Sequence, residues 1–222
     1  MGIRHDGEPR AREEREAVAI LGWGSLLWDL DDLAPKVAGP WKLRAGPRLP
    51  MEFSRISPKR LMSLVVCLDP EHGVGCATHT IRSTRGDVAQ AVADLAARER
   101  APLGRIGWAD AGGRGAGRMP EVVAAVGAWC AERGWAAAVW TDLEPNFRET
   151  TGGAFTVAEG VGYLRTLPGT GLGEARRYIR QAPATTRTPL RRALACDPWW
   201  RGLRAQALAA SSPSAPDLNL RA

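Results

Sequence analysis

Short apolar runs separated by turn residues predict several strands. Residues 17–21 are five consecutive apolar residues that end in a Gly-Trp-Gly-Ser turn, which is typical of a buried strand. Residues 61–68 and 74–81 form two further strand-like segments. The Asp-Pro-Glu-His-Gly turn between them predicts a β-hairpin. A further strand is expected at residues 135–140, Trp-Ala-Ala-Ala-Val-Trp.

Four segments with apolar residues at helical spacing predict helices. The first covers residues 87–100, where Asp87 is placed to cap the start and Pro102 follows the end. A proline at the first turn marks the start of a helix over residues 120–133. Shorter helices are expected at residues 156–167 and 172–181. Interspersed strands and helices predict a mixed α+β fold.

Length and composition favour a single domain. The chain has 222 residues, of which 45% are hydrophobic, and this is enough to bury one core. Residues 1–16 are charged and lack aromatics, and residues 209–222 are rich in Ala, Ser and Pro, so we expect a disordered leader and tail around a domain at 17–208. The glycine-rich residues 109–118 are expected to form a flexible loop.

The sequence gives no sign of a membrane or secreted protein. No apolar run approaches the roughly 20 residues that cross a bilayer, and the charged start lacks the apolar segment of a signal peptide. Cys67 and Cys76 would face each other across the predicted hairpin. None of the four cysteines has metal-ligand spacing, so we expect buried free thiols in a reducing cytoplasm.

The net charge of +6 raises the question of nucleic-acid binding. Only three of the 30 basic residues are lysine and the charge is spread along the chain, as in proteins from GC-rich genomes. The densest cluster combines arginines with two tryptophans: Arg187, Arg191, Arg192, Arg201, Arg204, Trp199 and Trp200. Arginine with aromatics can hold single-stranded nucleic acid. A solvated helix whose tryptophans cover the core is more ordinary, so no nucleic-acid partner is expected.

The glycine-rich turn after the first strand is the most informative motif. Gly22 and Gly24 allow positive φ and a close approach to a ligand, and successive amides can converge on an oxyanion. The motif Gly-Trp-Gly-Ser-Leu-Leu-Trp resembles the (Phe/Tyr)-Gly-Ser-(Asn/Leu) loop of the gamma-glutamylcyclotransferase superfamily, and most of all its ChaC-type branch. An ordinary strand-to-helix turn is the alternative. The resemblance implies a substrate-binding role for five residues: Gly22, Trp23, Gly24, Ser25 and Leu26.

The order of the next elements also resembles this superfamily, over about residues 17–100. An arginine- and proline-containing segment, a hairpin and a helix ending in Leu-x-x-Arg-Glu follow the loop. The catalytic glutamate of the family is the Glu of that pair, which implies Glu99 here. An Arg-Glu pair alone is usually a solvated helix face. Trp23 departs from the usual Tyr or Phe, and the chain beyond Arg100 does not follow the pattern.

The resemblance implies a mixed, barrel-like sheet flanked by helices and an enzyme that acts on a small gamma-glutamyl compound. In this family the α-amine of the substrate attacks its own γ-carbonyl, giving 5-oxoproline and a free amine or dipeptide without a metal or other cofactor. Glu99 would be the general base, and the loop amides would hold the oxyanion. Glutathione, a gamma-glutamyl amino acid and a gamma-glutamylamine all share the half that these groups would recognise.

Several alternatives stay open. The family often places a later tyrosine near the substrate, which here is Tyr163 or Tyr178. Arg55 would either pair with a substrate carboxylate or be an exposed arginine. Asp142 and Glu144, at the end of the last strand, form a rival cation or acid–base site, although such loops are more often plain turns.

A non-catalytic ligand-binding or interaction protein on the same fold is the alternative function, because a fold does not fix a function. One observation separates the two hypotheses. An enzyme requires that Glu99 point into the same cavity as residues 22–26.

Overall fold

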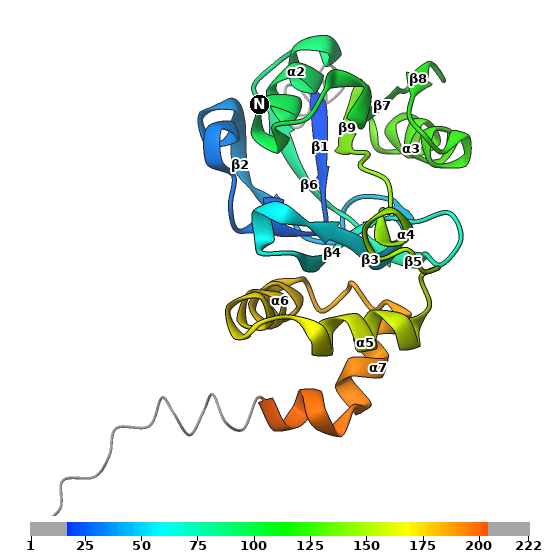
Figure 1. Cartoon of the computed structure of the whole chain (residues 1–222). Helices are drawn as coiled ribbons and strands as arrows, with labels where there is room; N and C mark the ends of the chain where they lie inside the picture. The colour runs from blue at the N-terminus through cyan, green and yellow to red at the C-terminus, as the bar shows by residue number, and fades with distance from the viewer. Residues whose placement is uncertain (1–16, 204–222) are drawn as a thin grey trace, which may run out of the picture.

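A computed structural model describes residues 17–203 (Figure 1). The expected leader at 1–16 and tail at 209–222 lie outside the described residues. The described part is a mixed α+β structure, as predicted, with one six-stranded sheet, one three-stranded sheet and helices around them. Its strands form these two sheets and no closed barrel. Among its helices, none combines the length and apolar character of a membrane-spanning segment.

The first strand lies in the middle of the larger sheet. β1 (Val18–Gly22) runs antiparallel to β6 (His79–Ser83) and parallel to β9 (Ala137–Thr141). All five β1 residues are buried, which explains the unbroken apolar run. Val18 and Ile20 belong to one core cluster and Ala19 and Leu21 to the other, as expected for side chains that alternate across a strand. The outer strands are β2 (Val37–Lys42), β7 (Ile106–Asp110) and β8 (Gly115–Ala116).

The predicted hairpin is wrong. β3 (Arg48–Ser57) lies between β4 (Ser63–Leu68) and β5 (Val74–Ala77) and is antiparallel to both. The chain then enters the other sheet as β6, so the segment 74–81 is divided between two sheets. Cys67 is opposite Glu52 and Cys76 is opposite Leu49 on β3, so the two thiols do not face each other.

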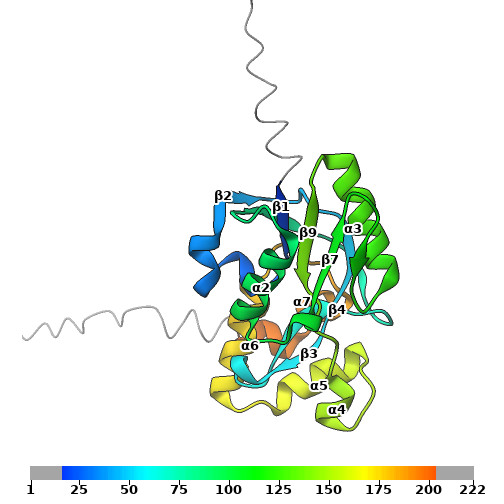
Figure 2. The ribbon, with the colours of Figure 1, turned by 90° about the horizontal axis from the view of Figure 1, so that it is seen from above.

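The predicted helices are confirmed. The Asp87 carboxylate caps α2 (Val88–Glu99) by accepting a hydrogen bond from the Ala89 amide at 3.0 Å. α3 (Pro120–Arg133) begins at its proline and lies beside β7 (Figure 2). The two shorter predicted helices are α5 (Val157–Thr166) and α6 (Gly169–Gln181). The structure also has α4 (Phe147–Thr151) and α7 (Pro189–Cys196), which were not predicted. In Figure 1, α5, α6 and α7 lie against the smaller sheet, where they contact β4 or β3.

Predictions for the glycine-rich segment, the cysteines and the two tryptophans were only partly right. The expected loop at 109–118 contains a short hairpin, because the Asp110 carboxylate accepts from the backbone amide and from Nε of Arg114, at 2.9 and 2.7 Å. Three cysteines are buried and free as expected, whereas Cys196 is exposed. The two tryptophans that follow α7 do cover the core: Trp200 is buried and Trp199 packs against it.

Candidate active site

A cavity of about 850 Å³ lies where the ends of β1 and α2 meet the smaller sheet. Residues 22–26 and Glu99 all line this cavity. The structure therefore brings together the two motifs that the sequence places more than 70 positions apart. Other side chains come from β3, β4, β9 and α6: Arg55, Cys67, Thr141 and Tyr178.

The loop after β1 lines the cavity and leads into a short helical turn. The chain forms one turn of 3₁₀ helix, Ser25–Leu27. The backbone hydrogen bonds of this turn begin with the Leu27 amide, which donates to the Gly24 carbonyl at 3.1 Å. The amides before Leu27 are the ones that a helix start leaves for other acceptors. The loop is anchored by two buried side chains, Trp23 and Leu26.

Gly22 and Gly24 are needed because neighbouring side chains pack closely against their backbone. The expectation that they adopt positive φ is wrong. Gly24 has φ −128°, and neither glycine has a positive φ. A Cβ atom on Gly22 would lie 2.6 Å from the Trp41 ring. A Cβ atom on Gly24 would lie 2.6 Å from the Tyr178 hydroxyl oxygen and 3.1 Å from Val66. Any side chain at these positions must displace a neighbour.

Glu99 is the last residue of α2, which ends because Arg100 adopts the left-handed conformation at φ 52°. Its Oε1 accepts from Arg98 Nη1 at 2.6 Å and from Thr141 Oγ1 at 3.1 Å. The Glu99 side chain is 14% exposed. Within residues 17–203, Oε2 has no hydrogen-bond partner. One carboxylate oxygen is therefore held in place and the other is available to a ligand.

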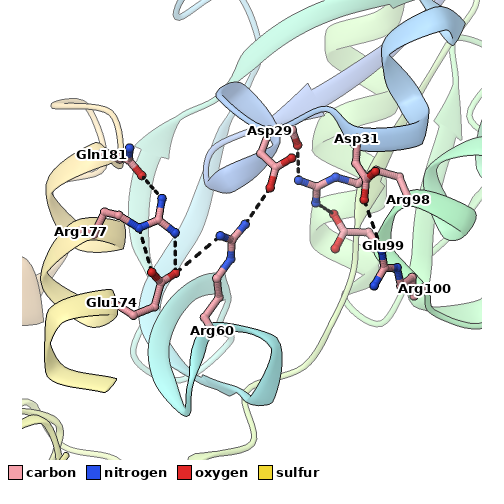
Figure 3. A network of polar contacts seen from close by, with 9 residues as sticks. All are labelled: Asp29, Asp31, Arg60, Arg98, Glu99, Arg100, Glu174, Arg177 and Gln181. Atoms are coloured by element: carbon pink, nitrogen blue, oxygen red, sulfur yellow. Dashed lines mark hydrogen bonds and ion pairs between the residues drawn. The ribbon is translucent and has the colours of Figure 1, made fainter. Parts of the chain in front are cut away.

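A chain of alternating charges connects Glu99 to the far wall of the cavity (Figure 3). Arg98 donates from Nη2 to the Asp29 carbonyl, just after the loop. The Asp29 carboxylate binds Arg60 at 3.1 Å, and Arg60 also lies 3.5 Å from Glu174 on α6. These contacts fix the end of α2 relative to the loop and to α6.

Tyr178, not Tyr163, is the tyrosine of the cavity. The Tyr178 side chain is buried, whereas Tyr163 donates its hydroxyl to the Met62 carbonyl at 2.7 Å and does not line the cavity. Burial raises the pKa of Tyr178 to about 12, and the nearby charge of Glu99 acts in the same direction. Tyr178 thus stays protonated at neutral pH and can donate a hydrogen bond into the cavity.

Arg55 is a cavity residue, so the interpretation as an exposed arginine is wrong. It lies on β3, is half-buried, and donates from Nη1 to the Glu144 carbonyl at 2.5 Å. The sequence alone could not place it, because the strand that carries Arg55 is interrupted by buried polar residues.

The residues of the rival site have separate partners. Asp142 is buried and accepts from the Arg118 amide at 2.5 Å, and Glu144 pairs with Arg105 at 2.5 Å. Asn146 bonds to the backbone of β3. Burial raises the pKa of Asp142. Across residues 17–203 we find no group of three or more His, Cys, Asp or Glu side chains that could hold a metal ion.

No family model, curated protein or solved structure matches the chain. The resemblance to gamma-glutamylcyclotransferases therefore depends on the sequence motifs alone.

Proposed function

We propose that this protein is a gamma-glutamylcyclotransferase-like enzyme that converts a small gamma-glutamyl compound into 5-oxoproline and a free amine or dipeptide. The observation that supports this most is the shared cavity of residues 22–26 and Glu99. The proposal includes the fold of that family, a cytoplasmic location and a reaction without a metal or other cofactor.

In the proposed reaction the substrate cyclises on itself. Glu99 takes a proton from the α-ammonium, and the free amine attacks the γ-carbonyl to form the new C–N bond. When the old amide C–N bond breaks, Glu99 returns the proton to the leaving nitrogen. The new ring nitrogen gives its second proton to the solvent, and the released amine takes up one proton from the solvent, so the protons balance. No water is consumed. Folding the substrate so that amine meets carbonyl supplies a proximity effect that can reach ~7–11 kcal/mol, and a positioned base adds about 10²–10⁴-fold.

The reaction also needs hydrogen-bond donors for the oxyanion and a fixed orientation of the base, and other cavity groups can supply both. The loop amides at residues 23, 24 and 26, which belong to the cavity lining, would donate to the tetrahedral oxyanion. Tyr178, with a pKa raised to about 12, can donate a further hydrogen bond. Arg98 and Thr141 hold Oε1 of Glu99, so that Oε2 can serve as the base.

A second candidate function is ligand binding without turnover. It is favoured by the ion pair between Glu99 and Arg98, at 2.6 Å, because this pair, with the bond from Arg98 to the Asp29 carbonyl, already gives Glu99 a structural role in holding the end of α2 against the loop. Such a protein would bind gamma-glutamyl compounds in the same cavity and release no product.

The test is a screen of glutathione, gamma-glutamyl amino acids and gamma-glutamylamines for 5-oxoproline release. We expect turnover of at least one compound, and binding without any 5-oxoproline would favour the second candidate. Glu99→Gln should lose at least tenfold more activity than Glu144→Gln, which removes a cavity carboxylate that is also paired with an arginine. The reverse order would move the base to the rival site.

A further inference from the structure

Arg118 joins the ends of two strands, one from each sheet. It lies just before α3, and its side chain is partly buried. Its Nη2 donates to the carbonyl of Leu68, the last residue of β4, at 3.0 Å. After the end of β9, its Nε donates to the Asp142 carbonyl at 2.8 Å and its Nη2 to the Leu143 carbonyl at 3.4 Å. Arg118 thus connects the smaller sheet to the larger one.

The same arginine also binds the side chain of Asp142. The Asp142 carboxylate accepts from the Arg118 backbone amide at 2.5 Å and lies 3.5 Å from Arg118 Nε. Asp142 is buried, and a buried carboxylate is costly to leave without hydrogen bonds. The Asp142 amide donates to the Arg105 carbonyl at 2.8 Å. Asp142 is therefore held through its carboxylate, its carbonyl and its amide.

Thr141, the residue before Asp142, carries this restraint to the cavity. Thr141 lines the cavity and Asp142 does not, as expected for neighbours whose side chains alternate at the end of a strand. The Thr141 hydroxyl donates to Glu99 Oε1 at 3.1 Å. The position of this hydroxyl depends on how the backbone of Asp142 is held.

We infer that Arg118 is a positioning residue for the proposed reaction: by fixing Asp142, it holds the Thr141 hydroxyl against the Glu99 carboxylate. The inference rests on the proposed function. Arg118 is not among the residues that line the cavity, so it acts through Thr141 and not on the substrate.

The test is a double-mutant cycle on turnover per folded molecule. Thr141→Val should lower kcat about tenfold, as for the loss of a hydrogen bond to a charged group, and leave KM nearly unchanged. Arg118→Gln should lower kcat by a similar factor. Because Arg118 acts through Thr141, the double variant should lose no more than the larger of the two single losses. Losses that multiply to about 100-fold would overturn the inference.

Arg191→Gln is the matched control. Arg191 is also partly buried and also donates to three backbone carbonyls, those of Ala182, Pro183 and Thr186, but it does not line the cavity. Its kcat per folded molecule should stay normal, and a fall as large as that of Arg118→Gln would overturn the inference. Arg118→Lys keeps the charge and should keep part of kcat. It takes the place of Arg118→Gln in the cycle if the glutamine variant does not fold.

A second measurement needs no substrate. The carboxyl ¹³C signal of Glu99, identified by its absence from Glu99→Gln protein, reports protonation of this side chain. Loss of a hydrogen-bond donor disfavours the charged carboxylate, so the midpoint of this titration should move to higher pH in Thr141→Val and Arg118→Gln but not in Arg191→Gln. If no gamma-glutamyl compound yields 5-oxoproline but the midpoint moves in this way, the proposed function fails and the positioning of Glu99 stands. An unchanged midpoint in Arg118→Gln removes the positioning role.

Discussion

Two glutamates of this protein, one buried and one partly buried, are used in different ways. Glu52, on β3, is fully buried, and each of its oxygens accepts a backbone hydrogen bond, from Phe53 at 2.7 Å and from Leu190 at 3.1 Å. Glu99 uses only Oε1 and faces a cavity. A carboxylate with both oxygens occupied holds the fold together, whereas one with a free oxygen in a cavity can act on a ligand.

The surroundings of Glu52 are those of a structural residue. Its partners include the Leu190 amide at the start of α7, where the helix dipole favours a negative charge. Burial nevertheless raises the pKa of Glu52. Glu52 thus links the smaller sheet to α7 and is not itself among the residues that line the cavity.

The largest expected effect is on turnover. Glu99→Gln keeps the shape of the side chain but removes the base, so kcat should fall by about 10²–10⁴-fold. The midpoint of urea unfolding should change little, because the glutamine carbonyl can still accept hydrogen bonds from Arg98 and Thr141. A folded Glu99→Gln protein with near-normal kcat would end the claim that Glu99 is the base.

Glu52→Ala should lower the stability of the protein and leave its turnover nearly unchanged. The change leaves the buried Phe53 and Leu190 amides without acceptors, and we expect a loss of about 2–4 kcal/mol in the free energy of unfolding. The measurement is urea denaturation followed by circular dichroism. Turnover per folded molecule should stay near normal. An unchanged unfolding midpoint would show that Glu52 does not stabilise the contact with α7.

A smaller effect is expected at the loop. Gly24→Ala should lower kcat/KM by about tenfold, because the new Cβ would lie 2.6 Å from the Tyr178 hydroxyl oxygen and displace the loop amides. Tyr178→Phe removes that oxygen, so the added loss from Gly24→Ala should be smaller in this background. Equal losses in both backgrounds would mean that the two residues do not interact.

The smallest effect concerns pH. The pKa of Tyr178 is raised from 10.0 to about 12, so the folded state keeps a proton that the unfolded state loses. This stabilisation is complete below pH 10 and is lost as pH rises towards 12. Near pH 11, wild type should have lost roughly 1 kcal/mol more stability than Tyr178→Phe. The same loss in both proteins would show that Tyr178 is not protected from ionisation.

Local signals predicted much of the fold. Asp87 and Pro120 mark the starts of α2 and α3 because capping and the fixed φ of proline act within a few residues. β3 was missed because buried polar residues such as Glu52 and Ser54 interrupt its apolar pattern. Their burial depends on partners far along the chain, which a local pattern does not reveal.

The sequence predicted only the cavity residues that belong to local motifs. The loop at 22–26 and Glu99 belong to motifs with a recognisable order, and both line the cavity. Tyr178 and Arg55 reach it through helix and strand packing. Nothing near Tyr178 in the sequence indicates that its hydroxyl lies against Gly24.

The most direct test of the account is to follow gamma-glutamylalanine in water enriched in ¹⁸O. Intramolecular attack predicts equal amounts of 5-oxoproline and alanine, neither of which gains ¹⁸O from the solvent. Glutamate that contains ¹⁸O would show hydrolysis by water and would contradict the proposed mechanism. The absence of 5-oxoproline from this and every other gamma-glutamyl compound would contradict the proposed function.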